Sequence, residues 1–332
     1  MFRLPNIPTI DAKHPSQAST VEIADLWEIL ALQSEKGSTS LEAIKSTLQL
    51  ASNPDPDSDS EADIELEGLL FGVLTEIKDR LKSCGSTVPI YPFKFKDTEV
   101  MISKPIEHGH YSYLFLLLAT RLNMAQHRSH AGHDGTLLFE EVCEIALGNI
   151  FGSRRRTLRF GASKLGGGFG DRMQELCEAL NDELKAKQNV SYQQDSGDDG
   201  LDIAAWIPFA DERRGKHAIF AQCKTGSSWE TADLRRLDPD IFCKLWMYPV
   251  PLVLPKRAFM SARRYEEANW EKSAYADLFF DRCRIMDYLQ DIPTDLMKKI
   301  KEWVDAAMLS EPFTMKVAKK SKTNRGRGRA LA

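Results

Sequence analysis

The chain has 332 residues, of which 42% are apolar and 28% charged, with 44 Lys and Arg against 48 Asp and Glu. This composition is typical of a globular protein with one large or two medium domains, and average Gly and Pro contents exclude a collagen-like or disordered chain. The longest purely apolar stretches, such as residues 114–119, are far shorter than the roughly 18–20 residues of a membrane span. We therefore expect no membrane partner.

The cysteines indicate a reducing compartment. There are six, without a Cys-x-x-Cys pair: Cys84, Cys143, Cys177, Cys223, Cys243 and Cys283. This pattern predicts reduced core residues, and neither a disulfide framework nor a zinc site. Because the N-terminal residues also lack the apolar segment of a secretory signal, we expect a cytoplasmic protein.

The first part of the chain is predicted to be mostly helical. Apolar residues recur at helical spacing in residues 21–34, 41–51, 66–84 and 110–125. Prolines and partial alternation in residues 87–102 predict short strands, and an acidic run in residues 55–67 contains a loop or linker. A polar break follows, so we place a domain boundary near residue 130 and expect residues 1–130 to form a domain for regulation or partner binding.

The second part alternates helices and strands. Helices are predicted in residues 136–152, 171–187, 233–248 and 294–308, and strands in residues 189–194, 201–209, 217–226, 251–261 and 276–286. This order predicts an α/β domain over residues 131–310, in which helices flank a mixed sheet. Arg282 and Arg284 are then expected to alternate on a strand edge, where they would approach phosphate or form surface ion pairs.

The chain ends in a basic tail over residues 311–332. Residues 316–329 include seven basic residues and no acidic one. Such like-charge blocks are usually disordered and often contact other molecules. The sequence leaves open whether this tail binds a partner or is a solvated end without function.

Three polar residues with chemical potential lie on two neighbouring β-prone runs. Asp202 begins the first run, and Gln222 and Lys224 lie two residues apart near the end of the second. Strand side chains alternate between faces, so Gln222 and Lys224 point the same way and Cys223 points to the opposite layer. If the runs pair as a hairpin around residues 209–216, Asp202 lies across from that end of the second strand.

An acid, an amide oxygen and a lysine at one spot suit the hydrolysis of a phosphodiester. Mg²⁺ prefers oxygen ligands, keeps several waters and also binds the substrate phosphate. A lysine beside it can orient or deprotonate the attacking water and can neutralise the transition state. We expect Glu140, on the helix before the strands, to supply a third oxygen ligand. Glu144 lies one turn further on the same face, and Glu141 is rotated away by about 100°.

At these residues the chain resembles the PD-(D/E)xK restriction-endonuclease-like superfamily. The resemblance covers under half of the chain and consists of Asp198, Gly200 and Asp202, followed after about twenty residues by Gln222 and Lys224. It is strongest to the Gln-x-Lys variants among Mrr-like restriction nucleases and anti-phage defence nucleases. It implies a restriction-endonuclease-like core of the order α-β-β-β-α-β.

The resemblance also implies roles for individual residues. The catalytic set is then Asp202, Gln222, Lys224 and Glu140. Asp202, Gln222 and Glu140 would hold Mg²⁺, for which Mn²⁺ can substitute, and Lys224 would assist the water. Glu175, on the second predicted helix, competes with Glu140 because a Gly-rich loop and that helix intervene before the strands.

The resulting hypothesis is a cytoplasmic, Mg²⁺-dependent endonuclease that hydrolyses DNA in an anti-phage or anti-plasmid defence system. The chain has no Gly-x-x-x-x-Gly-Lys-[Ser/Thr] motif, so any ATP-driven step would need a separate ATPase or another subunit of a defence complex. Gln222 in place of a carboxylate favours the main alternative, a catalytically inactive DNA-binding or scaffolding subunit. RNA as the substrate and a homo-oligomeric state are left open.

Overall fold

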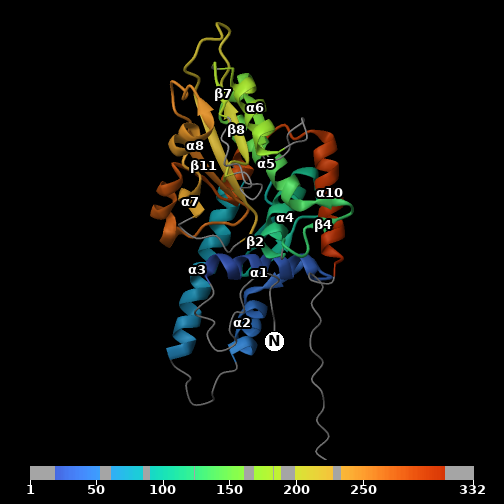
Figure 1. Ribbon diagram of the computed structural model, residues 1–332. Coiled ribbons are helices and arrows are strands. Elements are labelled where there is room, and N and C mark those ends of the chain that lie inside the picture. Colours follow the sequence, from blue (N-terminus) through green and yellow to red (C-terminus); the bar gives the residue numbers. More distant parts are fainter. Residues whose placement is uncertain are drawn as a thin grey trace, which may run out of the picture.

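Figure 1 shows the computed structural model, which describes residues 19–52, 61–84, 90–122, 124–160, 168–181, 183–187, 199–226 and 233–310. Several sequence predictions fall outside these ranges. They are the basic tail, most of the Gly-rich loop, Asp198 and the strand expected at residues 189–194. Among the described residues, none of the helices combines the length and the apolar character needed to cross a membrane.

The N-terminal helices and short strands are confirmed. The helices are α1 (Thr20–Gln33), α2 (Leu41–Ser52), α3 (Glu61–Ser83) and α4 (His108–Arg121), and a small antiparallel sheet contains β1 (Ser38–Ser40), β2 (Phe93–Lys96) and β3 (Glu99–Ile102). A capping box begins α1, because the Ser19 hydroxyl accepts from the Glu22 amide while the Glu22 carboxylate accepts from the Ser19 amide.

The centre of the molecule is a five-stranded mixed sheet, which confirms the α/β class. Its strands, in spatial order, are β12 (Leu278–Phe280), β11 (Lys256–Ser261), β9 (Ala218–Lys224), β8 (Ile203–Trp206) and β6 (Arg156–Arg159). β8 runs antiparallel to its two neighbours β6 and β9, whereas β9, β11 and β12 run parallel. The strand that comes first along the chain, β6, was not predicted, because its sequence is charged and lacks an apolar run.

Helices cover both faces of this sheet (Figure 1). One group consists of α5 (Gly135–Asn149), α9 (Arg282–Tyr288) and α10 (Thr294–Met308), and the other of α6 (Phe169–Leu180), α7 (Asp233–Arg236) and α8 (Pro239–Trp246). The remaining elements are short: β4 (Ser129–His130), β5 (His133–Asp134), β7 (Lys185–Ala186), β10 (Met247–Tyr248), η2 (Gly152–Arg154) and η4 (Glu267–Ala276). Alternation along β8 decides which group each side chain meets. Ile203 and Ala205 join the core with α5, and Ala204 and Trp206 join the core with α6 and α8.

The strand expected over residues 276–286 is correct only for its first part. β12 ends at Phe280, and the Asp281 carboxylate then caps α9 by accepting a hydrogen bond from the Arg284 amide at 3.0 Å. Arg282 and Arg284 therefore lie on a helix, and their expected alternation on a strand edge is wrong. Arg282 turns into the core and Arg284 is exposed.

One hydrophobic core joins residues from both sides of position 130. It contains side chains from α1, α3 and α4 together with others from α5, α9 and α10. Phe115 of α4, for example, contacts Trp303 of α10 edge to face, with ring centroids 5.0 Å apart. The division into two domains stays a prediction, and we expect the two parts to depend on each other for stability.

Buried charges reinforce this junction. Asp25 and Glu28 of α1 are fully buried, and the guanidinium groups of Arg80 of α3, Arg121 of α4 and Arg282 of α9 surround them. Arg80 lies 2.7 Å from Asp25 and 2.9 Å from Glu28, and Arg282 lies 2.8 Å from Asp25. We call these five residues the buried ion cluster. It connects three N-terminal helices with a helix that follows the central sheet.

The pKa values of the two acids of this cluster are shifted in opposite directions. Burial alone would raise the pKa of Asp25, but the charges of Arg121, Arg282 and Arg80 hold this pKa well below its usual value. Burial raises the pKa of Glu28, and the Arg80 charge offsets this increase only in part. Glu28 also accepts hydrogen bonds from the hydroxyls of Tyr91 at 2.6 Å and Tyr113 at 2.9 Å. The cluster therefore depends on the negative charge of Asp25 more than on that of Glu28.

The prediction of six reduced cysteines is wrong for two of them. Cys84, directly after α3, and Cys283 of α9 form a disulfide, with Cα atoms 5.0 Å apart. They are 199 residues apart in the chain, and only the tertiary fold brings them together. The other four cysteines are free thiols. Burial raises the pKa of both Cys177 and Cys243 to about 12, so these two thiols are unreactive near neutral pH.

Candidate functional site

The backbone around Asp202 fixes this residue at the edge of the sheet. Asp199 and Gly200 precede it with φ angles of 50° and 85°, so the chain makes a left-handed turn into β8. The Asp202 amide donates to the Ala221 carbonyl at 2.9 Å, and its own carbonyl accepts from the Phe160 amide at 2.8 Å. Asp202 is therefore held between the chain that follows β6 on one side and β9 on the other.

Gln222 lies beside Asp202 on the neighbouring strand. β8 and β9 pair antiparallel with Ile203 opposite Ala221, and the Asp202 amide also donates to the Ala221 carbonyl, so Asp202 faces the residue that precedes Gln222. The pairing of these two runs agrees with the prediction. The side chain of Gln222 is only 3% exposed, and its Oε1 atom is buried without a hydrogen-bond partner among the described residues. A buried amide oxygen of this kind normally needs a partner, such as a water or a cation.

Lys224 is the last residue of β9 and is half-buried. It is two residues from Gln222, so both side chains leave the same face of the strand. Lys224 pairs with Ser261 of β11, and its carbonyl accepts from the Ala262 amide at 3.2 Å. The structure therefore brings Asp202, Gln222 and Lys224 to one edge of the sheet, where β9 ends and β8 begins.

Glu140 approaches this edge from α5, on the other face of the sheet. The thiols of Cys143, on α5, and Cys223, on β9, lie between this helix and the sheet. Burial raises the pKa of both thiols. The carboxylates of Glu140 and Asp202 raise these pKa values further, so both acids lie close to the same two thiols. Alternation puts Cys223 on the α5 side and Gln222 on the opposite side. Glu140 is therefore near Asp202 and is separated from Gln222 by the strand.

The other candidate glutamates differ in how they are engaged. Glu144 accepts a hydrogen bond from the Thr157 hydroxyl at 2.7 Å and pairs with Arg159 at 2.9 Å, and Glu141 also pairs with Arg159 at 3.5 Å. These two acids therefore tie α5 to β6. Glu175 lies on α6, which packs on the face from which Gln222 and Lys224 project. Whether Glu175 or Glu140 supplies the further metal ligand therefore stays open.

The oxygen donors at this edge are suitable for Mg²⁺. The Asp202 Oδ2 atom accepts a hydrogen bond from the Cys223 amide at 2.6 Å, which fixes the carboxylate at the end of β9. Within the described ranges, no three His, Cys, Asp or Glu side chains come together as a metal cluster. A carboxylate and an amide oxygen are ligand types that a hard cation such as Mg²⁺ accepts.

The sequence reasoning missed Arg172, a basic residue near this edge. It lies on α6, and its guanidinium carbon is 5.3 Å from the ring centroid of Phe160, the residue whose amide donates to the Asp202 carbonyl. Its Nε atom is buried and has no hydrogen-bond partner among the described residues. The only signal in the sequence was an arginine in the first turn of the helix after the Gly-rich loop.

Known proteins give no further guide to this site. No model of a protein family matches the chain, and the searches of curated proteins and of solved structures also found no match.

Proposed function

We propose that this protein is a metal-dependent endonuclease that hydrolyses phosphodiester bonds in DNA. The observation that carries the proposal is the meeting of Asp202, Gln222 and Lys224 at one edge of the sheet, with the buried Gln222 oxygen lacking a hydrogen-bond partner among the described residues. An acid, a bare oxygen donor and a lysine are the parts that this reaction requires.

The order of the elements supports the same proposal. The core begins with a helix, α5, which three successively antiparallel strands follow, β6, β8 and β9. A second helix, α8, then leads to β11, which is parallel to β9. The resemblance to the PD-(D/E)xK superfamily implies this order for a restriction-endonuclease-like core. Further elements, among them the helices α6 and α7, lie between these parts of the core.

The residues of the chain would divide the chemistry among them. Asp202 would hold Mg²⁺ or Mn²⁺ together with either Gln222 and Glu175 on one face of β9 or Glu140 on the other. A bound Mg²⁺ lowers the pKa of a coordinated water and neutralises charge on the phosphate. The Lys224 ammonium would orient the attacking water and stabilise the negative charge that develops on the phosphate oxygens. The Cys223 amide keeps the Asp202 carboxylate in place throughout.

We further propose a role in defence against phage or plasmid DNA, together with a separate ATPase subunit. This part rests on the resemblance to anti-phage nucleases and on the missing ATP-binding motif. The second candidate function is a DNA-binding or scaffolding subunit without activity. Gln222 is the observation that favours it, because an amide adds no negative charge for a metal.

A cleavage assay separates these functions. The purified full chain is incubated with supercoiled plasmid, linear DNA or RNA in Mg²⁺, Mn²⁺ or EDTA. Nicking or linearisation of DNA that occurs in Mg²⁺ or Mn²⁺ and not in EDTA supports the nuclease. Cleavage of RNA without cleavage of DNA would mean that RNA is the substrate. Binding of DNA without cleavage under all metal conditions favours the inactive subunit.

Variants at Gln222 test its role as a metal ligand. Gln222→Glu is expected to keep cleavage and to lower the Mg²⁺ concentration needed for half-maximal rate, because a carboxylate binds Mg²⁺ more strongly than an amide does. Gln222→Ala removes the oxygen and should raise that concentration. Metal titrations of the cleavage rate measure both effects. An inactive Glu variant beside an Ala variant of normal activity would show that Gln222 is not a ligand.

The basic tail is expected to add sequence-independent affinity for DNA. Each cation that neutralises a phosphate releases counterions, so the logarithm of the binding constant falls with the logarithm of salt by about 0.9 per contact. With about two to four contacts, removing residues 316–332 should reduce this slope by roughly 2–4 units and leave the cleavage chemistry intact. Fluorescence anisotropy with duplex DNA between low and moderate salt measures the slope. An equal slope for the truncated chain would mean that the tail is a solvated end.

A further inference from the structure

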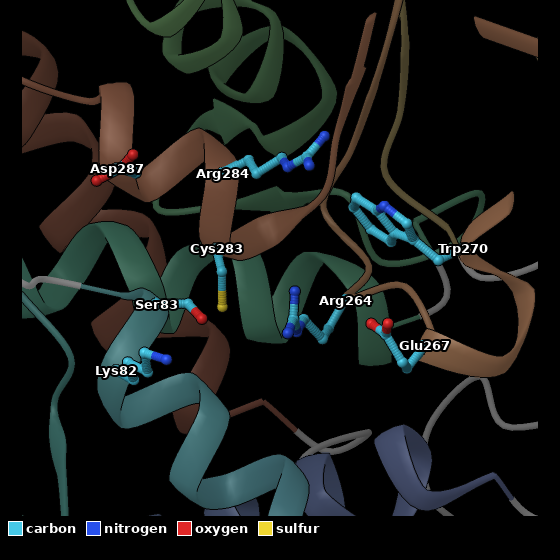
Figure 2. Close-up of a pocket in the computed structure, with 8 residues that line it drawn as sticks. All are labelled: Lys82, Ser83, Arg264, Glu267, Trp270, Cys283, Arg284 and Asp287. Atoms are coloured by element: carbon cyan, nitrogen blue, oxygen red, sulfur yellow. The ribbon is translucent and has the colours of Figure 1, made fainter. Parts of the chain in front are cut away.

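A cavity of about 470 Å³ lies where the end of α3, the chain after β11 and helix α9 meet (Figure 2). Its volume is within the range of small-ligand sites, roughly 300–1,000 Å³. Cys283 lies in its wall, so the disulfide with Cys84 ties α9 to the end of α3. The residues after β11 and β12 line it, so it opens at the carboxyl ends of these parallel strands, an edge where α/β sheets commonly bind ligands.

Three cations from three different elements line this cavity. Lys82 comes from α3, Arg264 from the chain after β11 and Arg284 from α9. In Figure 2, Lys82 and the Ser83 hydroxyl lie on one side of Cys283, and Arg264 and Arg284 lie on the other. Their side chains therefore present ammonium, hydroxyl and guanidinium donors to one open cavity.

Arg264 is fixed in position by two acids behind it. Its Nε atom donates to Glu76 at 3.3 Å, and its Nη1 atom donates to Asp281, which is fully buried. Asp281 and Glu76 also raise the pKa of Arg264 against the effect of its burial, so the guanidinium stays charged. The Nη2 atom donates to no described residue. A ligand in the cavity would thus meet an arginine that is already oriented.

Arg284 is held in a similar way, and Lys82 is not. The Arg284 Nη1 atom donates to the Phe279 carbonyl at 2.9 Å, and its guanidinium carbon is 4.3 Å from the centre of the Trp270 ring. Lys82 is exposed and forms no ion pair or hydrogen bond with any described residue. Two guanidinium groups that are held in place and one exposed ammonium group thus line the same cavity.

The donors suit a phosphate better than a carboxylate. A phosphate group carries up to two negative charges and offers more acceptor oxygens than a carboxylate, so it can use three cations and a hydroxyl together. The cavity also contains two acids, Glu267 and Asp287, neither of which pairs with a described residue. The negative charges of these acids repel a bound anion. Neutralising them should therefore raise the affinity for an anion, whereas neutralising the cations should lower it.

We propose that this cavity binds a phosphate group between Lys82, Arg264 and Arg284, carried either by a free nucleotide or by the end of a DNA strand. The phosphate assignment stands on the cavity alone. Only the DNA-end source also rests on the proposed nuclease function.

The test is isothermal titration of the full wild-type chain in metal-free buffer, where no metal-dependent cleavage interferes. The probes are inorganic phosphate, AMP, and one oligonucleotide with either a 5′-phosphate or a 5′-hydroxyl. We expect saturable binding of AMP or of the phosphorylated oligonucleotide with a Kd below about 1 mM. Tighter binding of AMP identifies a nucleotide as the source, and discrimination between the two oligonucleotides identifies a DNA end.

Charge variants then locate the binding. Arg284→Gln should weaken it by about tenfold or more, and Lys82→Gln by a smaller factor, because each loses a charge-assisted contact. Both side chains are exposed, so the fold should tolerate these changes. Glu267→Gln and Asp287→Asn should tighten binding severalfold. Arg213→Gln and Lys298→Gln, at side chains that are 86% and 76% exposed elsewhere, are the matched controls.

Two results would overturn the proposal. One is the absence of saturable binding for every phosphate-bearing probe at millimolar concentration. The other is binding that responds equally to the cavity variants and to the two control variants. A failed cleavage assay would leave both measurements valid, so loss of the proposed function and loss of this site can be told apart.

Discussion

Replacing Lys224 by alanine is expected to lower the rate of metal-dependent DNA cleavage by about a hundredfold or more. In the proposed mechanism the ammonium group would orient the attacking water and neutralise charge on the phosphate. Asp202→Ala should abolish cleavage, because it removes the carboxylate that the Cys223 amide fixes at the end of β9 and that the proposal assigns to the metal. Single-turnover cleavage of a supercoiled plasmid in Mg²⁺ measures both effects.

A matched lysine provides the control for this experiment. Lys256 begins β11 and is exposed, so Lys256→Ala removes the same charge from the opposite end of the parallel strands. It should cleave at the wild-type rate. Thermal unfolding of each variant shows whether the fold is intact. Wild-type cleavage by Lys224→Ala or Asp202→Ala would falsify the assignment of the site.

The second large effect is expected in the buried ion cluster. Asp25→Asn keeps the size of the side chain but leaves Arg80, Arg121 and Arg282 buried without their main counter-charge. Breaking a buried ion pair in this way costs about 3–5 kcal/mol of unfolding free energy. Urea denaturation followed by circular dichroism measures the difference from the wild-type chain.

Glu28→Gln is the matched control, three residues away on the same helix and equally buried. Because burial raises the pKa of Glu28, its charge contributes less, and the glutamine oxygen can still accept from Tyr91 and Tyr113. We expect a clearly smaller loss than for Asp25→Asn. Equal losses for the two variants would mean that the cluster does not depend on the charge of Asp25.

The pH dependence of the Asp25 effect has a definite sign. The pKa of Asp25 is lower in the folded chain than its usual value of 3.8, so its stabilising contribution is complete above that value and falls as the pH drops below it. The difference between the wild-type chain and Asp25→Asn should therefore be about 1 kcal/mol smaller at pH 3 than at pH 7. Urea denaturation at the two pH values checks this expectation.

Secondary structure was predictable wherever one apolar period dominated a segment. The helices in the first part of the chain, α5 and the paired strands β8 and β9 all have such a period, and the structure contains them. β6 was not predictable, because a charged edge strand next to salt-bridged glutamates carries no apolar signal. The strand expected to continue beyond Phe280 ended early, because the Asp281 side chain caps a helix there.

The sequence by itself determined which residues share the candidate site on β8 and β9. Strand alternation puts Gln222 and Lys224 on one face, and the hairpin of β8 and β9 brings the start of β8 back to the end of β9 that carries them. These are local relations, which depend on spacing of a few residues and on one turn.

Only the tertiary structure decided the relations between distant segments. It buries Arg282 against Asp25, joins Cys84 to Cys283, and gathers Lys82, Arg264 and Arg284 around one cavity. It also places Glu140 on the α5 side of the strand that carries Gln222. None of these contacts has a local periodic signal, because each depends on how α3, α5 and α9 pack around the sheet, and that packing is decided by burial of the whole core.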